Sequence, residues 1–248
     1  TRSLHLTNIK HYTLLEILPA FTHGRTSLIE QGSLEPQKSR SDLSLTAKYG
    51  LSSQLVLDGT INPDFSQVES DAGQVDFNLR YALFYPEKRP FFLEGREKFI
   101  LAASESGNPL ESVVHTRTIV DPLLGFKLIG KVGPKDTIAS IYALDELEQG
   151  MPEDYAHVAI ARYKHALSGD SFIGGVWTSR FEGSRYNLVA GSDGNIRLSP
   201  SSYFAYQALV SQTKAAGQSG DVKGQALNLL YYYNTRDRLF QVTLQDLG

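Results

Sequence analysis

Apolar and polar residues alternate along most of the chain, and this alternation predicts an all-β fold. Between residues 41 and 51 every second residue is apolar, and most of the residues between them are polar. A period of two is typical of a strand with one apolar and one polar face. Residues 54–62 continue the pattern after Ser52 and Ser53, which suit a turn, so a β-hairpin that ends at Pro63 is predicted.

Compact turn sequences such as GPKD, LSGD, LSPS and NTRD separate further predicted strands. A weaker first strand within residues 14–29 is interrupted by Pro19 and Gly24. The other predicted strands are residues 74–83, 114–120, 124–132, 137–145, 155–166, 171–181, 186–198, 202–213, 224–234 and 239–246. Strands in such simple succession predict an antiparallel up-and-down meander.

The predicted meander is interrupted at residues 85–112, an irregular insertion that is long enough to have a functional role. We therefore divide the chain into an N-terminal linker with the first weak strand (1–40) and a β-domain (41–248) that contains this insertion. If the short turns LSGD, LSPS and NTRD are periplasmic, the strand count places the insertion on the same side, where it would fold into a barrel lumen.

Three features of the pattern favour a membrane β-barrel over a soluble β-sandwich. Several predicted strands run to about ten residues, and cations fall inside strands, as a hydrated lumen would allow: Lys127, Lys131, Arg162 and Arg197. Aromatic residues lie near strand ends, as in the aromatic girdles of barrels: Tyr81, Phe84, Tyr155, Phe181, Tyr203, Tyr231 and Tyr233. Strands of a soluble sandwich also alternate, and aromatic residues fill its core, so the pattern alone leaves both folds open.

Composition excludes several function classes. The net charge is only -3, which argues against a nucleic-acid partner. There is no cysteine, and the six histidines show no HxH or HExxH spacing, so we expect no metal site. Neither a GxSxG elbow nor a phosphate-binding glycine loop is present, so no cofactor is expected. No apolar run is long enough for a membrane helix.

Two motifs carry a family resemblance: INPDFSQVESD at residues 61–71 and FYPEKRPFFLEG at residues 84–95. With the segment DPLLGFKLIGK at residues 121–131, they resemble the domain of unknown function 5916 family. The resemblance implies a β-barrel of the bacterial outer membrane, in contact with its lipid, that commonly follows a family-nine-like carbohydrate-binding module. Because the family domain is longer than this chain, the resemblance also implies an incomplete barrel, truncated at the C-terminus, whose missing strands follow residue 248.

The signature loops supply the candidate site residues: Asn62, Asp64, Gln67, Glu69, Asp71, Glu87, Lys88, Arg89, Phe91, Phe92 and Glu94. We interpret them as a binding site or as a structural lock that holds the insertion against the barrel wall, with the paired phenylalanines burying aromatic area. Paired carboxylates can also hydrolyse glycosides, which makes Glu69 and Glu94 the catalytic candidates. Carboxylates beside arginines are more often ion-paired, so no catalytic residue is assigned.

Three functions follow from these observations. The first is an outer-membrane β-barrel that takes up or handles a carbohydrate-related ligand at the cell surface, with carbohydrate bound through an upstream module. The second is a carbohydrate-active hydrolase that uses the loop carboxylates. The third is a soluble β-rich binding domain whose sheet closes without lipid.

Overall fold

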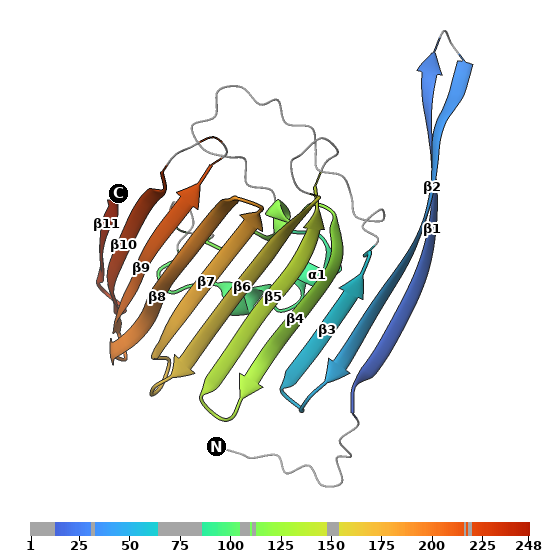
Figure 1. Cartoon of the computed structure of the whole chain (residues 1–248). Helices are drawn as coiled ribbons and strands as arrows, with labels where there is room; N and C mark the ends of the chain where they lie inside the picture. Colours follow the sequence, from blue (N-terminus) through green and yellow to red (C-terminus); the bar gives the residue numbers. More distant parts are fainter. Residues whose placement is uncertain are drawn as a thin grey trace.

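The computed structural model describes residues 13–30, 33–63, 86–104, 110, 113–147, 154–215, 217 and 220–248. They form one eleven-stranded sheet in which each strand pairs antiparallel with its sequence neighbours (Figure 1). The strands are β1 (Leu15–Glu30), β2 (Ser33–Gly50), β3 (Leu55–Ile61), β4 (Pro122–Val132), β5 (Asp136–Glu146), β6 (Tyr155–Ala166), β7 (Phe172–Glu182), β8 (Arg185–Ser199), β9 (Ser202–Lys214), β10 (Val222–Asn234) and β11 (Leu239–Leu247). The all-β antiparallel meander predicted from the sequence is therefore confirmed.

The sheet is open, because β1 and β11 form its two edges. At the first edge, β2 pairs with β3 only from Leu45 to Gly50, so the far half of the β1–β2 hairpin extends beyond the rest of the sheet (Figure 1). In the part of the chain described above, no helix is long and apolar enough to cross a membrane.

Most predicted strands form, but residues 114–120 do not. They contain the 3-10 turn η2 (Thr116–Thr118) and belong to no strand, so that prediction was wrong. The predicted strand 74–83 lies outside the described residues. Because β3 pairs directly with β4, and the Asn62 amide donates to the Leu123 carbonyl at 2.7 Å, the connection 62–121 leaves and re-enters at one end of the sheet. That is the end opposite the LSGD, LSPS and NTRD turns. The predicted side of the insertion depends on residues 74–83, which lie outside the described residues, so it stays a prediction.

The register divides the strand side chains between two faces of opposite character. We call the face that carries residues 86–104 and 113–121 the inner face and the other the outer face. On the outer face, Phe126 lies opposite Gly59 and Tyr142, and Trp177 lies opposite Ala161 and Ala190. The exposed large side chains of this face include Ile17, Phe21, Leu43, Tyr49, Leu57, Ile61, Phe126, Tyr142, Tyr163, Trp177, Phe181, Val210, Val242 and Leu244.

The inner face instead buries polar and charged side chains. Those that lie on its strands are Asp58, Thr60, Lys127, Asp145, Arg162, Asp193, Gln207 and Asn228. In a soluble protein with one core, polar residues face water and apolar residues are buried. This sheet departs from that arrangement, because its inner face buries charges and amides among apolar side chains such as Ile141 and Ile160 while its outer face exposes large apolar residues. The buried charges have specific partners on the segment described next.

Residues 86–104 and 113–121, which we call the inner segment, lie against the inner face, within the curve of the sheet (Figure 1). The inner segment contains α1 (Pro90–Leu93), η1 (Arg96–Phe99) and η2. Its main apolar contacts are made by Phe92, Phe99 and Ile119, which pack on small and branched side chains of β5 and β6 such as Ala139 and Ile141. These aromatic and aliphatic contacts fix where the polar groups of the segment meet the inner face of the sheet, which we call the wall.

Glycine permits the close approach of the inner segment to β4 at two points. Gly95 has a φ of 76°, and a Cβ there would lie 2.5 Å from the Cδ1 of Ile129. Gly125 of β4 lies under the Phe91 ring, which a Cβ would approach to 3.2 Å. A side chain at either position would push the segment away from the sheet.

Candidate functional site

The inner segment is built around a buried pair, Glu87 and Arg89. The Arg89 side chain donates from Nε to Oε1 of Glu87 and from its second guanidinium nitrogen to Oε2, both at 2.8 Å. Thr116 donates its hydroxyl to Oε2 of Glu87 at 2.6 Å. Arg89 also donates to the backbone carbonyls of Thr116 and Ile119, and its guanidinium lies 4.3 Å from the centre of the Phe92 ring. This pair therefore holds the two halves of the inner segment together.

A second cluster joins the segment to β2, β3 and β4. Lys127 of β4 is buried, and its Nζ lies 3.0 Å from Oδ2 of Asp58 and donates to the Phe91 carbonyl at 2.6 Å. It also lies 4.9 Å from the centre of the Phe91 ring. Lys48 of β2 donates to both carboxylate oxygens of Glu94, at 2.8 and 2.7 Å. Glu94 therefore belongs to an ion-paired cluster and is its most solvent-exposed member.

Asp145 of β5 binds the end of the inner segment. Its Oδ1 accepts from the backbone amides of Val120 and Asp121 at 2.9 and 2.8 Å. Its Oδ2 accepts from Arg180 of β7 at 3.1 Å, and Arg180 also donates to the Thr118 carbonyl. The side chains of Asp145 and Arg180 thus make the hydrogen bonds that these backbone groups would otherwise form within a sheet.

The third attachment lies on β6 and β8 to β10. Asp193 accepts from the Ala102 amide and from Arg162, both at 2.7 Å and both at Oδ2. Gln207 donates to the Ala102 carbonyl, and Asn228 donates to the Ala103 carbonyl at 3.0 Å. Across all three attachments, the wall mainly contacts backbone atoms of the inner segment. The polar inner face of the sheet therefore holds a folded segment of the same chain in place.

The pKa shifts of the two loop carboxylates fit this structural role. Burial raises the pKa of Glu87, but hydrogen bonds from Arg89 and Thr116 outweigh it, so the pKa is lowered overall. The hydrogen bond from Lys48 lowers the pKa of Glu94, and burial opposes this only in part. A general acid in glycoside hydrolysis needs a raised pKa. Both carboxylates are instead stabilised as anions.

The structure brings together one part of the predicted site. Glu87, Lys88, Arg89, Phe91, Phe92 and Glu94 all lie on the inner segment. Asn62 lies apart from them at the end of β3, with a φ of 46°, and donates its side-chain amide to the Leu43 carbonyl at 2.9 Å. Asp64, Gln67, Glu69 and Asp71 lie outside the described residues.

Sequence reasoning missed the wall partners Asp58, Asp145, Asp193, Gln207 and Asn228. The signal that could have found them is a polar residue at an interior strand position. Lys127 and Arg162 were recognised by that signal, and both are buried in ion pairs. Carboxylates and amides inside strands carry the same signal.

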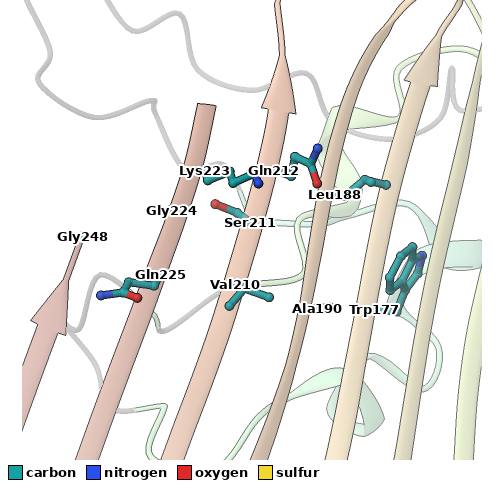
Figure 2. Close-up of a pocket in the computed structure, with 10 residues that line it drawn as sticks. All are labelled: Trp177, Leu188, Ala190, Val210, Ser211, Gln212, Lys223, Gly224, Gln225 and Gly248. Atoms are coloured by element: carbon teal, nitrogen blue, oxygen red, sulfur yellow. The ribbon is translucent and has the colours of Figure 1, made fainter. Parts of the chain in front are cut away.

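A hollow also lies on the outer face, across β7 to β10 (Figure 2). Two rows of paired residues form most of it: Trp177, Ala190, Val210 and Gln225 in one row, and Leu188, Gln212 and Lys223 in the next. The small side chain of Ala190 leaves room between Trp177 and Val210, and the residues that line the hollow include no carboxylate or histidine. Among the residues that the structure describes, no group of three or more His, Cys, Asp or Glu side chains is placed to hold a metal ion.

Fold and site together define an all-β protein whose antiparallel meander binds a segment of its own chain on its polar face. Residues 15–103 match the family model described as Domain of unknown function (DUF5916). The match covers β1 to β3 and the inner segment as far as Ala103, and it confirms the family resemblance carried by the two motifs. No curated protein matches the chain.

Proposed function

We propose that the chain forms part of a β-barrel of the bacterial outer membrane, with the inner segment lining or filling its lumen. The observation that carries the proposal is the distribution of side chains between the two faces. The outer face exposes large apolar residues from β1 to β11, while the inner face holds charges and amides. Apolar-out and polar-in is the pattern of a sheet that meets hydrocarbon on one side and a polar lumen on the other.

Outward aromatic residues lie toward both ends of the strands, as membrane girdles do. Tyr49 and Tyr163 lie near the short-turn end, and Tyr155 and Phe181 lie near the opposite end. Between them, the outer face carries small side chains such as Ala159 together with the rings of Phe126 and Trp177. Amphipathic aromatic rings favour the two interfaces of a bilayer, which accounts for this spacing.

The edges indicate that the barrel contains more strands than these eleven. An unpaired strand edge in hydrocarbon would leave each free backbone group unsatisfied at a cost of several kcal/mol. The outer faces of β1 and β11 are as apolar as the rest, with Ile17 at one edge and Val242 and Leu244 at the other. We therefore propose that further strands join β1 to β11 and close the sheet.

The role that fits such a barrel is uptake or surface handling of a carbohydrate-related ligand. The family resemblance and the polar wall support it. Hydrolysis by the loop carboxylates gains no support from Glu94, because the Lys48 ammonium occupies both of its oxygens. Nor does Glu87 support it, since it is buried in its pair with Arg89.

Cell fractionation of the full-length parent protein tests the membrane proposal. We expect recovery in the outer-membrane fraction and faster migration of the unheated sample on a denaturing gel, since a closed barrel resists the detergent until it is boiled. A protein that is soluble without detergent and migrates identically with and without heating would overturn the proposal. That result would favour a soluble β-rich binding domain.

A further inference from the structure

The aromatic residues of the strands face outward with three exceptions among the described residues. Phe172 of β7, Tyr203 of β9 and Tyr232 of β10 point to the inner face, as their cross-strand neighbours show. Tyr203 pairs with Arg197 on one side and Tyr232 on the other, and Phe172 lies in the next row opposite Asn195. All three lie at the short-turn end of the wall. Tyr203 had been predicted as a girdle residue, so that prediction was wrong.

These inward rings are close together and only half buried. The rings of Tyr203 and Tyr232 stack with their centres 5.1 Å apart and an angle of 29° between their planes. Phe172 and Tyr203 both pack against the apolar cluster of Ala102, Ala205 and Leu230. The site therefore adjoins the end of the inner segment, where Gln207 and Asn228 hold it.

Two cations lie over these rings. The Lys164 Nζ is 3.8 Å from the centre of the Phe172 ring, and the Arg197 guanidinium is 5.7 Å from the centre of the Tyr203 ring. Arg197 also pairs with Asp170 at 2.9 Å, and both side chains of that pair are exposed to solvent. Among the described contacts of Lys164 and Arg197, Asp170 is the carboxylate that forms an ion pair, so the two cations leave a local excess of positive charge.

We propose that Lys164, Phe172, Arg197, Tyr203 and Tyr232 form a binding site for an acidic oligosaccharide, one whose sugar rings carry carboxylates. The C–H face of a sugar ring packs on aromatic rings such as the stacked tyrosines. A ring carboxylate then accepts from Arg197, whose planar fork suits bidentate binding of a carboxylate and which exchanges its exposed partner Asp170 for the ligand. Lys164 on β6 adds a second positive charge to the same site.

This inference rests on the proposed function, because it names the ligand class that the lumen wall would take. It depends on the inner-face site alone, and membrane insertion depends on the outer face. The two can therefore fail separately. Heat-dependent migration of each sample, recorded before the binding experiment, shows whether the barrel has formed.

Isothermal titration of the full-length parent protein, purified in detergent, with galacturonate and alginate trimers tests the inference. We expect saturable binding that weakens as salt is added, and no comparable binding of a neutral galactose trimer. Arg197→Gln should weaken binding at least about tenfold, the loss expected for one charge-assisted contact. Tyr232→Leu should also weaken binding, because it removes one of the two stacked rings. Arg236→Gln, in the β10–β11 turn at the same end of the sheet, is the matched control and should bind like the original protein.

Three outcomes would overturn the inference. One is failure of both acidic trimers to bind a sample that passes the heat-migration test. Another is equal binding of acidic and neutral trimers. The third is unchanged affinity in Arg197→Gln and Tyr232→Leu, which would place the bound sugar elsewhere.

Discussion

Two Arg–Asp pairs on the inner face show how strongly surroundings decide what an ion pair contributes. Arg162 and Asp193 lie 2.7 Å apart, and their side chains are 1% and 0% exposed. Arg197 and Asp170 lie 2.9 Å apart, but they are 36% and 75% exposed. Water screens the exposed pair and competes with it. Removing one partner of the buried pair instead leaves a charge without compensation.

Asp193→Ala should therefore destabilise the protein by about 3–5 kcal/mol, whereas Asp170→Ala should cost about 0–1 kcal/mol. Denaturant unfolding of both variants in one detergent measures the difference. The double replacement of Arg162 by Met and Asp193 by Leu should recover much of the loss, because it removes both charges. Similar stability of the two single variants would contradict this account of the buried pair.

The Glu87 carboxylate makes the attachment of the inner segment sensitive to acid. Its pKa is lowered in the folded protein, because Arg89 and Thr116 hydrogen-bond the anion more strongly than burial opposes it. A group with a depressed folded pKa stabilises the fold above its unfolded pKa, about 4.3 for Glu. That stabilisation is lost as the pH falls through the folded pKa.

Proteolysis of the inner segment should therefore become faster below about pH 4 and stay slow at neutral pH. Glu87→Gln should be cleaved faster already at neutral pH, with a weaker further change in acid. An acid-stable protease and mapping of the cut sites provide the measurement. Equal protection of the original protein and Glu87→Gln at neutral pH would rule out this role.

At the scale of the element, the inner segment is ordered by the wall rather than by its own helical turns. Its α-helix contains four residues, fewer than an isolated helix needs to be stable in water. Phe92 is 2% exposed and packs into the largest apolar cluster, whereas its neighbour Leu93 is 41% exposed. Phe92 is therefore the most deeply buried apolar contact of α1, with the Phe91 ring packed beside it.

Phe92→Ala should weaken docking of the inner segment by about 3–5 kcal/mol, whereas Leu93→Ala should change it by less than about 0.5 kcal/mol. Amide hydrogen exchange by mass spectrometry resolves the effect. Peptides from residues 86–104 should exchange faster in Phe92→Ala, while peptides from β7 to β9 keep their protection. Loss of protection throughout the sheet would show that the segment is required for the fold itself.

At the scale of the whole molecule, the outer face provides a test that separates a lipid-facing sheet from a soluble one. Phe126 and Val132 lie on the same strand and on the same face. Their exposed fractions are nearly equal, 50% and 49%. Phe126 lies toward the middle of β4 and Val132 at its end, so only a membrane would distinguish them strongly.

Phe126→Arg should cost about 2–4 kcal/mol and Val132→Arg about 0–1 kcal/mol, because the penalty for an outward cation depends on depth in the bilayer. Reversible unfolding in lipid vesicles measures both, and Phe126→Leu controls for the lost ring. Equal and small costs for the two arginine variants would indicate a face that contacts water.

The sequence predicted the strands well because their signal is local. Alternation and turn residues located β6 at its observed bounds and most of the other described strands to within a few residues, but β2 begins at Ser33 rather than at residue 41. Residues 114–120 also suggested a strand, yet their backbone groups bind Arg89, Arg180 and Asp145. Those partners are distant in sequence, so no local pattern could show that they compete with a sheet.

The sequence by itself determined the order of the strands, the compact turns between them and the charged and aromatic residues of the insertion. Only the tertiary structure decided which face of β9 is inner, because the alternate series that begin at Tyr203 and at Phe204 both mix aromatic, aliphatic and polar residues. It also decided which charges meet, since Arg162 and Asp193 are brought together by register across two strand pairings. The local sequence decides whether a segment forms a strand or a turn. The burial of each side chain, and therefore the partner of each charge, depends on the whole sheet.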